Sequence, residues 1–274
     1  MYSSEIVGQE RLKRQLKLMV SGRQIPHCQL FIDSNGFGGL PLALYSAMGL
    51  LHGYSALETA EKKGNPSQKL FNHPDLHFVY PVVNRSSGGS KSVSDDYKLD
   101  WDKFLFTHPY GSIQDWIRQL DAGNKQGMIG VEEVAKMHHK MFLKAHDGGN
   151  KVMILFGADK LSETASNKLL KLLEEPPKNS YFFLIGEQIG GMLPTLISRC
   201  QQIKLGPLSS EEIQAGLKKM NVALGVSPSA SSGRGSWRKV LDELNVPSHT
   251  VHHEGLWIQC LRAAFRARAN KAIV

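Results

Sequence analysis

Long hydrophobic runs and cysteine-rich motifs are both missing from this chain of 274 residues. No stretch reaches the ~18 consecutive apolar residues that a membrane-spanning helix needs, and Met1 to Glu5 lack the apolar segment typical of a secretion signal. The cysteines are Cys28, Cys200 and Cys260. Their wide separation excludes a disulfide scaffold and a Cys-x-x-Cys zinc site, and it favours a reducing compartment. We therefore predict a cytoplasmic protein without membrane contact.

The chain has fewer acidic than basic residues, which gives it a formal net charge of +8. Hydrophobic residues make up 41% of the chain, which is enough for a substantial core. The excess positive charge gathers in two clusters, one at Lys13, Arg14, Lys17 and Arg23 and the other at Arg262, Arg266, Arg268 and Lys271. Such clusters bind DNA in some proteins and are solvated surface in most. A DNA-binding module, with affinity that falls steeply with salt, is therefore one hypothesis.

Strands and helices alternate along most of the chain. Apolar runs predict strands at 27–32, 151–156, 181–185 and 202–205, and helical periodicity predicts helices at 5–22, 41–52, 112–121, 130–145 and 161–175. The Ser/Gly-rich residues 84–96 predict a loop. We expect Phe104, Phe106, Tyr110 and Trp116 in the core. The alternation predicts an α/β fold, with a parallel sheet and helices on both faces.

The pattern changes after Pro207. Ser209 followed by Glu212 predicts a helix N-terminus, because the two side chains can cap each other's backbone N–H groups. Helical patterns at 211–220 and 236–244 flank a Ser/Gly-rich stretch, and a further helix is predicted at 256–267. We predict an α/β core at 1–206, a small all-helical domain at 207–248 and the start of another helical domain at 249–274. The last helix has nothing after it to pack against, so we expect the chain to be truncated.

A glycine-rich turn follows the 27–32 strand, where a nucleotide-binding P-loop would lie. A working P-loop, G-x-x-x-x-G-K-[ST], binds phosphate through backbone N–H groups and a lysine, and magnesium through a hydroxyl. Here Asp33 stands at the first glycine position, Gly39 at the lysine position and Leu40 at the hydroxyl position. Gly36, Gly38 and Gly39 leave a vestigial loop that we do not expect to bind ATP tightly. We predict no cofactor; an active ATPase with unusual site residues is the alternative.

The 151–156 strand lacks the acidic pair that positions magnesium and water in active NTPases. Phe156 and Gly157 stand there, and neither side chain offers an oxygen ligand. Asp159 comes two to three residues late, and we do not expect it to substitute. Two independent losses indicate a nucleotide-binding fold whose own site is inactive.

The histidines do not indicate a metal site either. Side chains of the adjacent His138 and His139 point in different directions on a helix, so they cannot easily share an ion. We expect these two, and His249, His252 and His253, to be surface or partly buried residues. The sequence predicts no bound metal.

One polar element survives, in the run Leu193-Pro-Thr-Leu-Ile-Ser-Arg-Cys200. An arginine at such a loop can reach the ATP site of a neighbouring subunit, where it stabilises the charge of the transferring phosphoryl group. The spacing of Arg199 is equally compatible with a surface ion pair, and both interpretations stay open at this point.

Three motifs together resemble the AAA+ subunits of DNA polymerase clamp loaders, in particular the delta-prime family of bacterial DNA polymerase III. They are the run Asn167-Lys-Leu-Leu-Lys-Leu-Leu-Glu-Glu-Pro-Pro177, the run ending in Ser198-Arg199-Cys200, and the N-terminal Ile6-Val7-Gly8-Gln9. The resemblance covers residues 5 to about 245. It implies an AAA+ P-loop-type fold in which 207–248 is the lid and 249–274 begins the collar.

The resemblance also implies a function. Delta-prime subunits do not hydrolyse ATP; they act as a rigid stator in the ring that loads the sliding clamp on DNA during replication. Their Ser-Arg-Cys arginine, here Arg199, reaches the ATP of the neighbouring gamma/tau subunit. The implied partners are the gamma/tau and delta subunits, the sliding clamp, and primer–template DNA through the assembled complex.

Two features depart from the family. Many relatives carry a cysteine-ligated zinc module, but the corresponding residues 56–74 contain no cysteine, and His73 and His77 alone make a poor zinc site. The collar is also incomplete, so we expect poor assembly into the ring.

Overall fold

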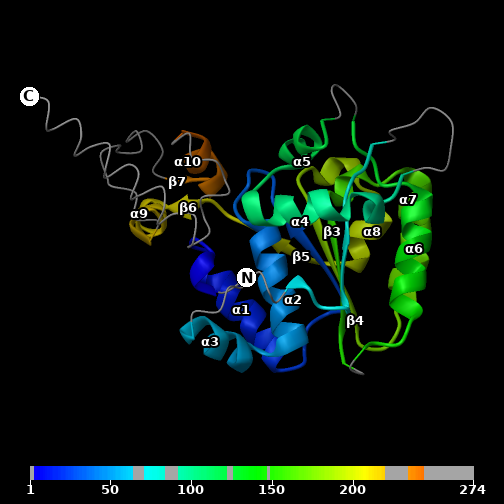
Figure 1. The fold of residues 1–274 in the computed structure, drawn as a ribbon, viewed down its shortest axis with the longest axis horizontal. Coiled ribbons are helices and arrows are strands. Elements are labelled where there is room, and N and C mark those ends of the chain that lie inside the picture. Colours follow the sequence, from blue (N-terminus) through cyan, green and yellow to red (C-terminus); the bar gives the residue numbers. More distant parts are fainter. Residues whose placement is uncertain are drawn as a thin grey trace, which may run out of the picture.

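The centre of the molecule is a five-stranded parallel sheet in the order β2-β3-β4-β1-β5 (Figure 1). The computed structural model describes residues 3–63, 71–83, 92–121, 126–146, 149–219 and 234–243. The strands are β1 (Cys28–Ile32), β2 (Leu76–Val79), β3 (Lys151–Phe156), β4 (Ser180–Gly186) and β5 (Gln201–Lys204). Every residue of β1 and β3 is buried, as expected where helices cover both faces. The predicted α/β fold is confirmed.

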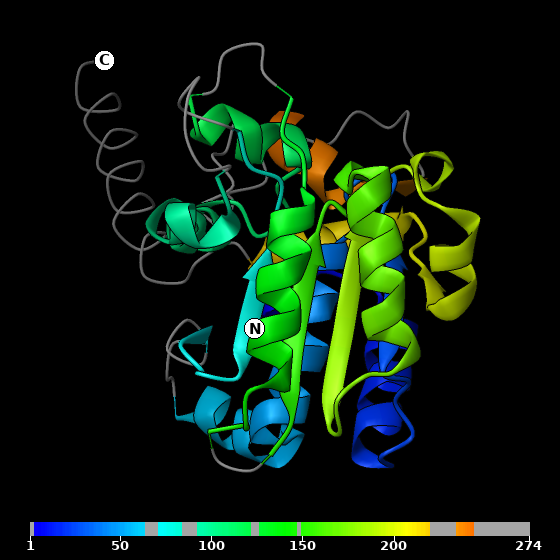
Figure 2. The same ribbon diagram turned by 90° about the vertical axis from the view of Figure 1, so that its right-hand side faces the viewer.

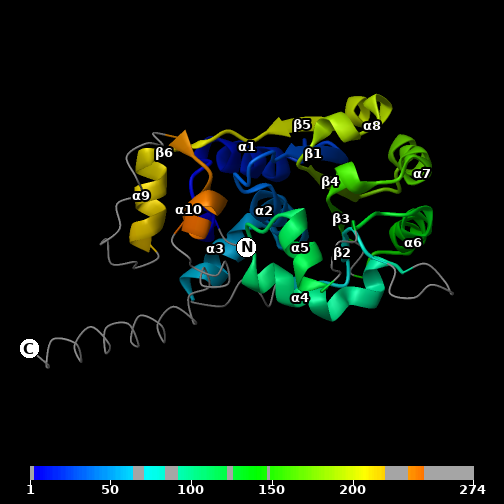
Figure 3. The ribbon, with the colours of Figure 1, turned by 90° about the horizontal axis from the view of Figure 1, so that it is seen from above.

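Helices cover the sheet on both sides (Figures 2 and 3). On one face lie α1 (Glu10–Ser21) and α2 (Gly39–His52), and on the other lie α6 (Val131–Phe142) and α7 (Glu163–Glu174). The other elements of the core are α3 (Tyr54–Lys62), α4 (Lys98–Thr107), α5 (Ile113–Gln119), α8 (Pro194–Arg199) and the short turns η1 (Ser3–Glu5), η3 (Ser94–Tyr97), η4 (Ala158–Lys160) and η5 (Ile189–Gly191). Phe104, Tyr110 and Trp116 are buried and Phe106 is half-buried, which confirms them as core residues.

The N-terminal helix begins later than predicted. Gly8 and Gln9 have φ angles of 61° and 57°, in the left-handed region, so helical backbone can start only at Glu10. Lys13, a member of the first basic cluster, is neither solvated surface nor open to DNA, because it is 3% exposed. Its Nζ donates to the carbonyls of Ser3 (3.3 Å) and Ile6 (3.1 Å). Together with Glu10 Oε1, which lies 2.5 Å from Nζ, these carbonyls satisfy the buried ammonium.

A smaller unit follows Pro207 and packs against Val7 and Tyr110 of the core (Figure 3). It contains α9 (Ser210–Lys219), α10 (Trp237–Glu243) and the antiparallel strands β6 (Leu208–Ser209) and β7 (Arg234–Gly235). The predicted capping box is confirmed: Glu212 N donates to Ser209 Oγ (3.2 Å), and Ser209 N donates to Glu212 Oε2 (2.9 Å). The two-residue strands correct the expectation of a purely helical unit; they pair because the residues before α9 and α10 run side by side in opposite directions.

Several predictions lie outside the described residues. They include the helix at 256–267, the second basic cluster, Cys260, His249, His252, His253 and residues 84–91 of the expected loop. Residues 94–97, at the end of that loop, form η3. Within the part of the chain that the structure describes, no helix is long and apolar enough to cross a bilayer.

Candidate functional site

The candidate site lies at the carboxyl edge of the parallel sheet, where ligands bind in open α/β folds. The glycine loop at 33–38 joins β1 to α2. Beside it, η4 follows β3 and carries Asp159, while Glu187 directly follows β4. These connections bring every residue of the predicted nucleotide site to one edge.

The Asp33 carboxylate occupies the centre of the glycine loop. Its Oδ1 accepts a hydrogen bond from Phe37 N (2.5 Å), and its Oδ2 accepts from Gly39 N (2.7 Å) and Gly38 N (3.3 Å). The side chain is 4% exposed. Successive backbone N–H groups of this kind form an anion-binding concavity, and here the anion is supplied by the chain itself. The Asp33 carboxylate therefore fills the place where a P-loop would hold a phosphate.

The loop glycines make this arrangement possible. Gly38 has a φ angle of 108°, which residues with a Cβ rarely adopt, and this conformation helps turn three consecutive N–H groups towards Asp33. A Cβ at Gly39 would lie 2.9 Å from the Cβ of Asp33. The two departures from the P-loop pattern are therefore linked, because a lysine at position 39 would not fit beside Asp33 as it stands.

Arg238, in the first turn of α10, lies across the loop. Its Nε donates to the carbonyl of Tyr110 (2.7 Å) and its Nη2 to that of Gly111 (3.1 Å). A Cβ on Gly36 would lie only 2.5 Å from Arg238 Nε, so the guanidinium packs directly against the loop backbone. The smaller unit thus contacts the loop through the Arg238 guanidinium, which is held by hydrogen bonds to Tyr110 and Gly111.

Glu187 completes this contact from the sheet side. Its Oε1 lies 3.3 Å from Arg238 Nη1 and accepts a weaker hydrogen bond from Ile113 N (3.4 Å). Burial raises the pKa of the Glu187 carboxyl above its ordinary value, and Arg238 offsets part of that effect. The carboxylate and the guanidinium are both largely buried, so each one limits the cost of burying the other.

Tyr110 closes the other side of the loop. Its hydroxyl accepts a hydrogen bond from Val7 N (2.9 Å), and its ring would lie 3.1 Å from a Cβ on Gly38. Burial raises the pKa of this phenol, which stays protonated. Tyr110 belongs to an apolar cluster shared by the N-terminal segment and the smaller unit, with Val7, Leu208, Ile213, Leu217, Trp237, Val240 and Leu241.

The end of β3 offers no magnesium ligand at the expected place. Phe156 is 2% exposed and packs in the core. Asp159 is buried, and its Oδ1 accepts from Glu187 N (3.0 Å) while its Oδ2 lies 3.3 Å from Lys160 Nζ. Among the described residues, no group of three or more His, Cys, Asp or Glu side chains could hold a metal ion.

Arg199 has more open surroundings than the residues of the glycine loop. It is the last residue of α8, and its Nη2 pairs with Glu174 Oε1 at the end of α7. The side chains of Arg199 and Glu174 are 39% and 46% exposed. Nη1 also donates a long hydrogen bond to the Thr195 carbonyl (3.4 Å). The flanking Cys200 is buried, while Ser198 Oγ bonds to Thr195 O (3.0 Å).

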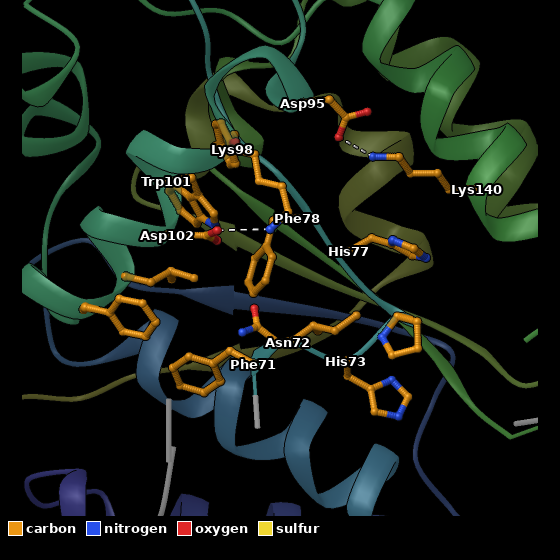
Figure 4. A pocket seen from close by; sticks show the side chains of 15 residues that line it. Phe71, Asn72, His73, His77, Phe78, Asp95, Lys98, Trp101, Asp102 and Lys140 are labelled. Atoms are coloured by element: carbon orange, nitrogen blue, oxygen red, sulfur yellow. Dashed lines mark hydrogen bonds and ion pairs between the residues drawn. The ribbon is translucent and has the colours of Figure 1, made fainter. Parts of the chain in front are cut away.

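A cavity of about 370 Å³ lies beside β2, the outermost strand on one side of the sheet (Figure 4). It contains His73 and His77, the two histidines considered for zinc, and its rim carries the ion pairs Lys98–Asp102 and Lys140–Asp95. Burial, and the positive charge of Lys140, lower the pKa of His77 to about 4. Its floor is aromatic, with Phe78 and Trp101.

Sequence reasoning missed Tyr110 and Arg238 as parts of the loop's environment. Tyr110 was assigned to the core only, and nothing local marks it as a neighbour of the loop. Arg238 did leave a signal, because a cation in the first turn of a helix opposes the helix dipole and implies a partner outside the helix.

Comparison with known proteins gives a family. A family model described as DNA polymerase III, delta subunit, matches residues 8–209. The DNA polymerase III subunit delta' of Bacillus subtilis is 26% identical over 217 residues, which are 78% of this chain and 53% of the relative. That of Haemophilus influenzae is 42% identical over 85 residues, 31% of this chain and 26% of the relative. The chain thus spans about half or less of the length of these curated relatives.

Solved structures overlap more loosely. A gamma subunit-related protein of DNA polymerase III from Thermotoga maritima has a TM-score of 0.46 at 14% identity, covering 86% of this chain and 53% of its own. The RuvB Holliday junction branch migration motor of the same organism has a TM-score of 0.41 at 13% identity, covering 81% of this chain and 54% of its own.

Proposed function

This chain belongs to the family described as DNA polymerase III, delta subunit, and we propose that it serves as a clamp-loader subunit that does not hydrolyse ATP. Its role is that of the delta-prime stator, which supports neighbouring gamma/tau and delta subunits while the sliding clamp is loaded on primer–template DNA. It contributes Arg199 to the ATP site of a neighbouring ATPase subunit.

The observation that carries the proposal is the occupied cradle. Three backbone N–H groups that would bind a phosphate are hydrogen-bonded to Asp33 instead. A nucleotide would have to displace a buried carboxylate and then meet its negative charge, with no lysine at position 39 to offset it. Charge and occupancy therefore act in the same direction, against nucleotide binding.

The contacts between the core and the smaller unit support a rigid role. Ser236 Oγ donates to the carbonyl of Gly36 (3.0 Å), and Gln9 N donates to Glu212 Oε1 (3.0 Å). Together with Arg238 on Tyr110 and Gly111, these bonds join the two units directly at the glycine loop. An orientation set by the chain's own hydrogen bonds does not depend on whether a nucleotide is bound.

The exposure of Arg199 supports its role in a neighbour's site. A guanidinium that is 39% exposed and held by one exposed carboxylate can exchange that partner for a phosphate at small cost. In such positions an arginine stabilises the charge that develops during phosphoryl transfer. The exposed ion pair and the arginine finger are thus two states that one side chain can adopt.

Equilibrium binding of ATP to the isolated chain tests the occupied cradle. A fluorescent ATP analogue is titrated with and without magnesium, and a gamma subunit serves as the positive control. We expect no magnesium-dependent binding at micromolar nucleotide, while circular dichroism shows that the protein is folded. Micromolar, magnesium-dependent affinity would overturn the proposal and identify an active ATPase.

A further inference from the structure

Two cysteines at the start of adjacent strands lie side by side. Cys28 is the first residue of β1, and Cys200 directly precedes β5. The parallel register pairs Gln29 with Gln201, so the preceding residues, Cys28 and Cys200, are neighbours across the two strands. Adjacent strands are about 4.8 Å apart, which is within the range of Cα separations that a disulfide can bridge.

The side chains turn towards each other. The two Sγ atoms are 2.7 Å apart, closer than non-bonded sulfur atoms normally approach, and both residues are free thiols. Cys28 is 1% exposed and Cys200 is 7% exposed, within the apolar cluster that lies beneath α7 and α8. No loop has to close and no strand has to slip for the sulfurs to meet.

We propose that Cys28 and Cys200 are a modification site, a dithiol that a peroxide converts into an intramolecular disulfide. The Cys200 thiolate attacks one peroxide oxygen, the O–O bond breaks, and Cys200 becomes a sulfenic acid while hydroxide leaves and is protonated to water. The Cys28 sulfur then attacks the Cys200 sulfur, the S–O bond breaks, and the Cys28 proton leaves with the hydroxyl group as water. Two thiols are oxidised by two electrons, and one peroxide is reduced to two waters.

Exposure sets which sulfur meets the oxidant first. Cys28 is the more deeply buried thiol, and its hydrogen bond to Cys200 together with burial raises its pKa. Cys200 is the more exposed of the two and follows the last residue of α8, next to solvent-accessible Arg199. Cys200 therefore meets the oxidant, and Cys28 resolves the sulfenic acid that lies against it.

The bond would join two functional parts of the fold. It would tie the end of α8, which carries Arg199, to the first residue of β1, the strand that lies between β4 and β5 in the sheet. The same strand leads into the glycine loop at its other end. The modification is a property of the chain alone and does not depend on the proposed role in the clamp loader.

Mass spectrometry of the full chain tests the proposal, with Cys260→Ser introduced so that only the pair remains. After hydrogen peroxide, we expect a monomer lighter by two hydrogen atoms, with no thiol titratable in denaturant and both recovered by dithiothreitol. Tryptic digestion should join the peptides 24–62 and 200–204. The control, Cys28→Ala in the same background, should instead gain oxygen at Cys200 or link two chains through it.

Two outcomes would overturn the proposal. One is a folded Cys260→Ser protein in which both thiols survive peroxide, while the same chain unfolded in urea forms the disulfide. The other is the addition of oxygen to Cys200 at the same rate with and without Cys28. If Cys28→Ala does not fold, the joined peptides in the Cys260→Ser protein decide the question alone.

Discussion

Two of the arginine–carboxylate pairs among the described residues have very different surroundings. Arg238 and Glu187 meet at the glycine loop, where their side chains are 19% and 23% exposed and further hydrogen bonds hold both. Arg199 and Glu174 meet at the ends of α8 and α7, and they are 39% and 46% exposed. The first pair belongs to a site closed by its own chain. The second pair leaves the Arg199 guanidinium accessible to solvent and to a neighbouring molecule.

Under the proposed function, this difference corresponds to a fold that has lost its own nucleotide site and has kept an arginine for a neighbour's site. Closing the loop required a carboxylate in the cradle and an arginine across it, so the polar groups that would bind nucleotide are satisfied internally. Arg199 has no such network, and an exposed ion pair contributes about 0–1 kcal/mol. Mutations at the glycine loop and at Arg199 test whether this difference in burial leads to different roles.

The largest expected effect is on catalysis by a neighbour. In a reconstituted clamp loader, Arg199→Ala should lower ATP turnover at the site that the arginine reaches by on the order of 10³-fold or more, because the developing phosphoryl charge loses its cation. Single-turnover hydrolysis and clamp loading measure the loss. Arg118→Ala is the matched control, since Arg118 is another exposed helical arginine paired with a carboxylate.

Unchanged turnover and unchanged clamp loading with Arg199→Ala would show that the guanidinium only makes a surface ion pair. Complex formation must be checked by gel filtration, because a loss of assembly would mimic a loss of catalysis. Equal losses in the Arg118 and Arg199 variants would also contradict the comparison.

The next effect is on stability. Asp33→Ala should lower the free energy of unfolding by about 3 kcal/mol, because three backbone N–H groups in a buried loop lose a charged acceptor. The matched change, Glu174→Ala, removes an exposed partner and should cost less than about 1 kcal/mol. Urea denaturation of the isolated chain measures both. Similar losses of unfolding free energy in the two variants would mean that Asp33 does not stabilise the protein through its hydrogen bonds to the loop.

The smallest effect concerns pH and Glu187. Its pKa is raised by burial in the folded state, so the protonated form favours folding. This contribution is fully present below the carboxyl's ordinary pKa of about 4.3 and is lost as the pH rises through the folded value. Unfolding free energies measured from pH 4 upward should therefore fall less in Glu187→Gln than in the unaltered protein. Parallel pH profiles would rule out a perturbed carboxyl at the loop.

Local patterns predicted much of this fold. The β3 run at 151–156 and the Ser209–Glu212 capping box depend on neighbours in sequence, and both lie where the pattern places them. The strand β2 was missed, because Leu76–Val79 is a short run directly after a turn and carries a histidine. The start of α1 was placed too early, because the left-handed backbone of Gln9 leaves no signal in its residue type.

The sequence predicts which P-loop residues are missing, but it does not predict which groups occupy the loop in their place. Asp33, Gly39 and Leu40 differ from the P-loop pattern, and the difference is visible in the sequence alone. That the Asp33 carboxylate turns back onto Phe37, Gly38 and Gly39 depends on the path of the loop. That Tyr110 and Arg238 meet there depends on tertiary packing between segments more than a hundred residues apart in sequence.

The position of Tyr110 also bears on how the protein unfolds. Its hydroxyl holds the backbone at Val7, and its ring shares one apolar cluster with α9 and α10. Melting the smaller unit would expose Trp237 to water and would uncover Tyr110 and its hydrogen bond to Val7, which the apolar cluster now covers. The two units are thereby thermodynamically coupled, so the described parts of the chain should lose their structure in one cooperative step rather than unit by unit.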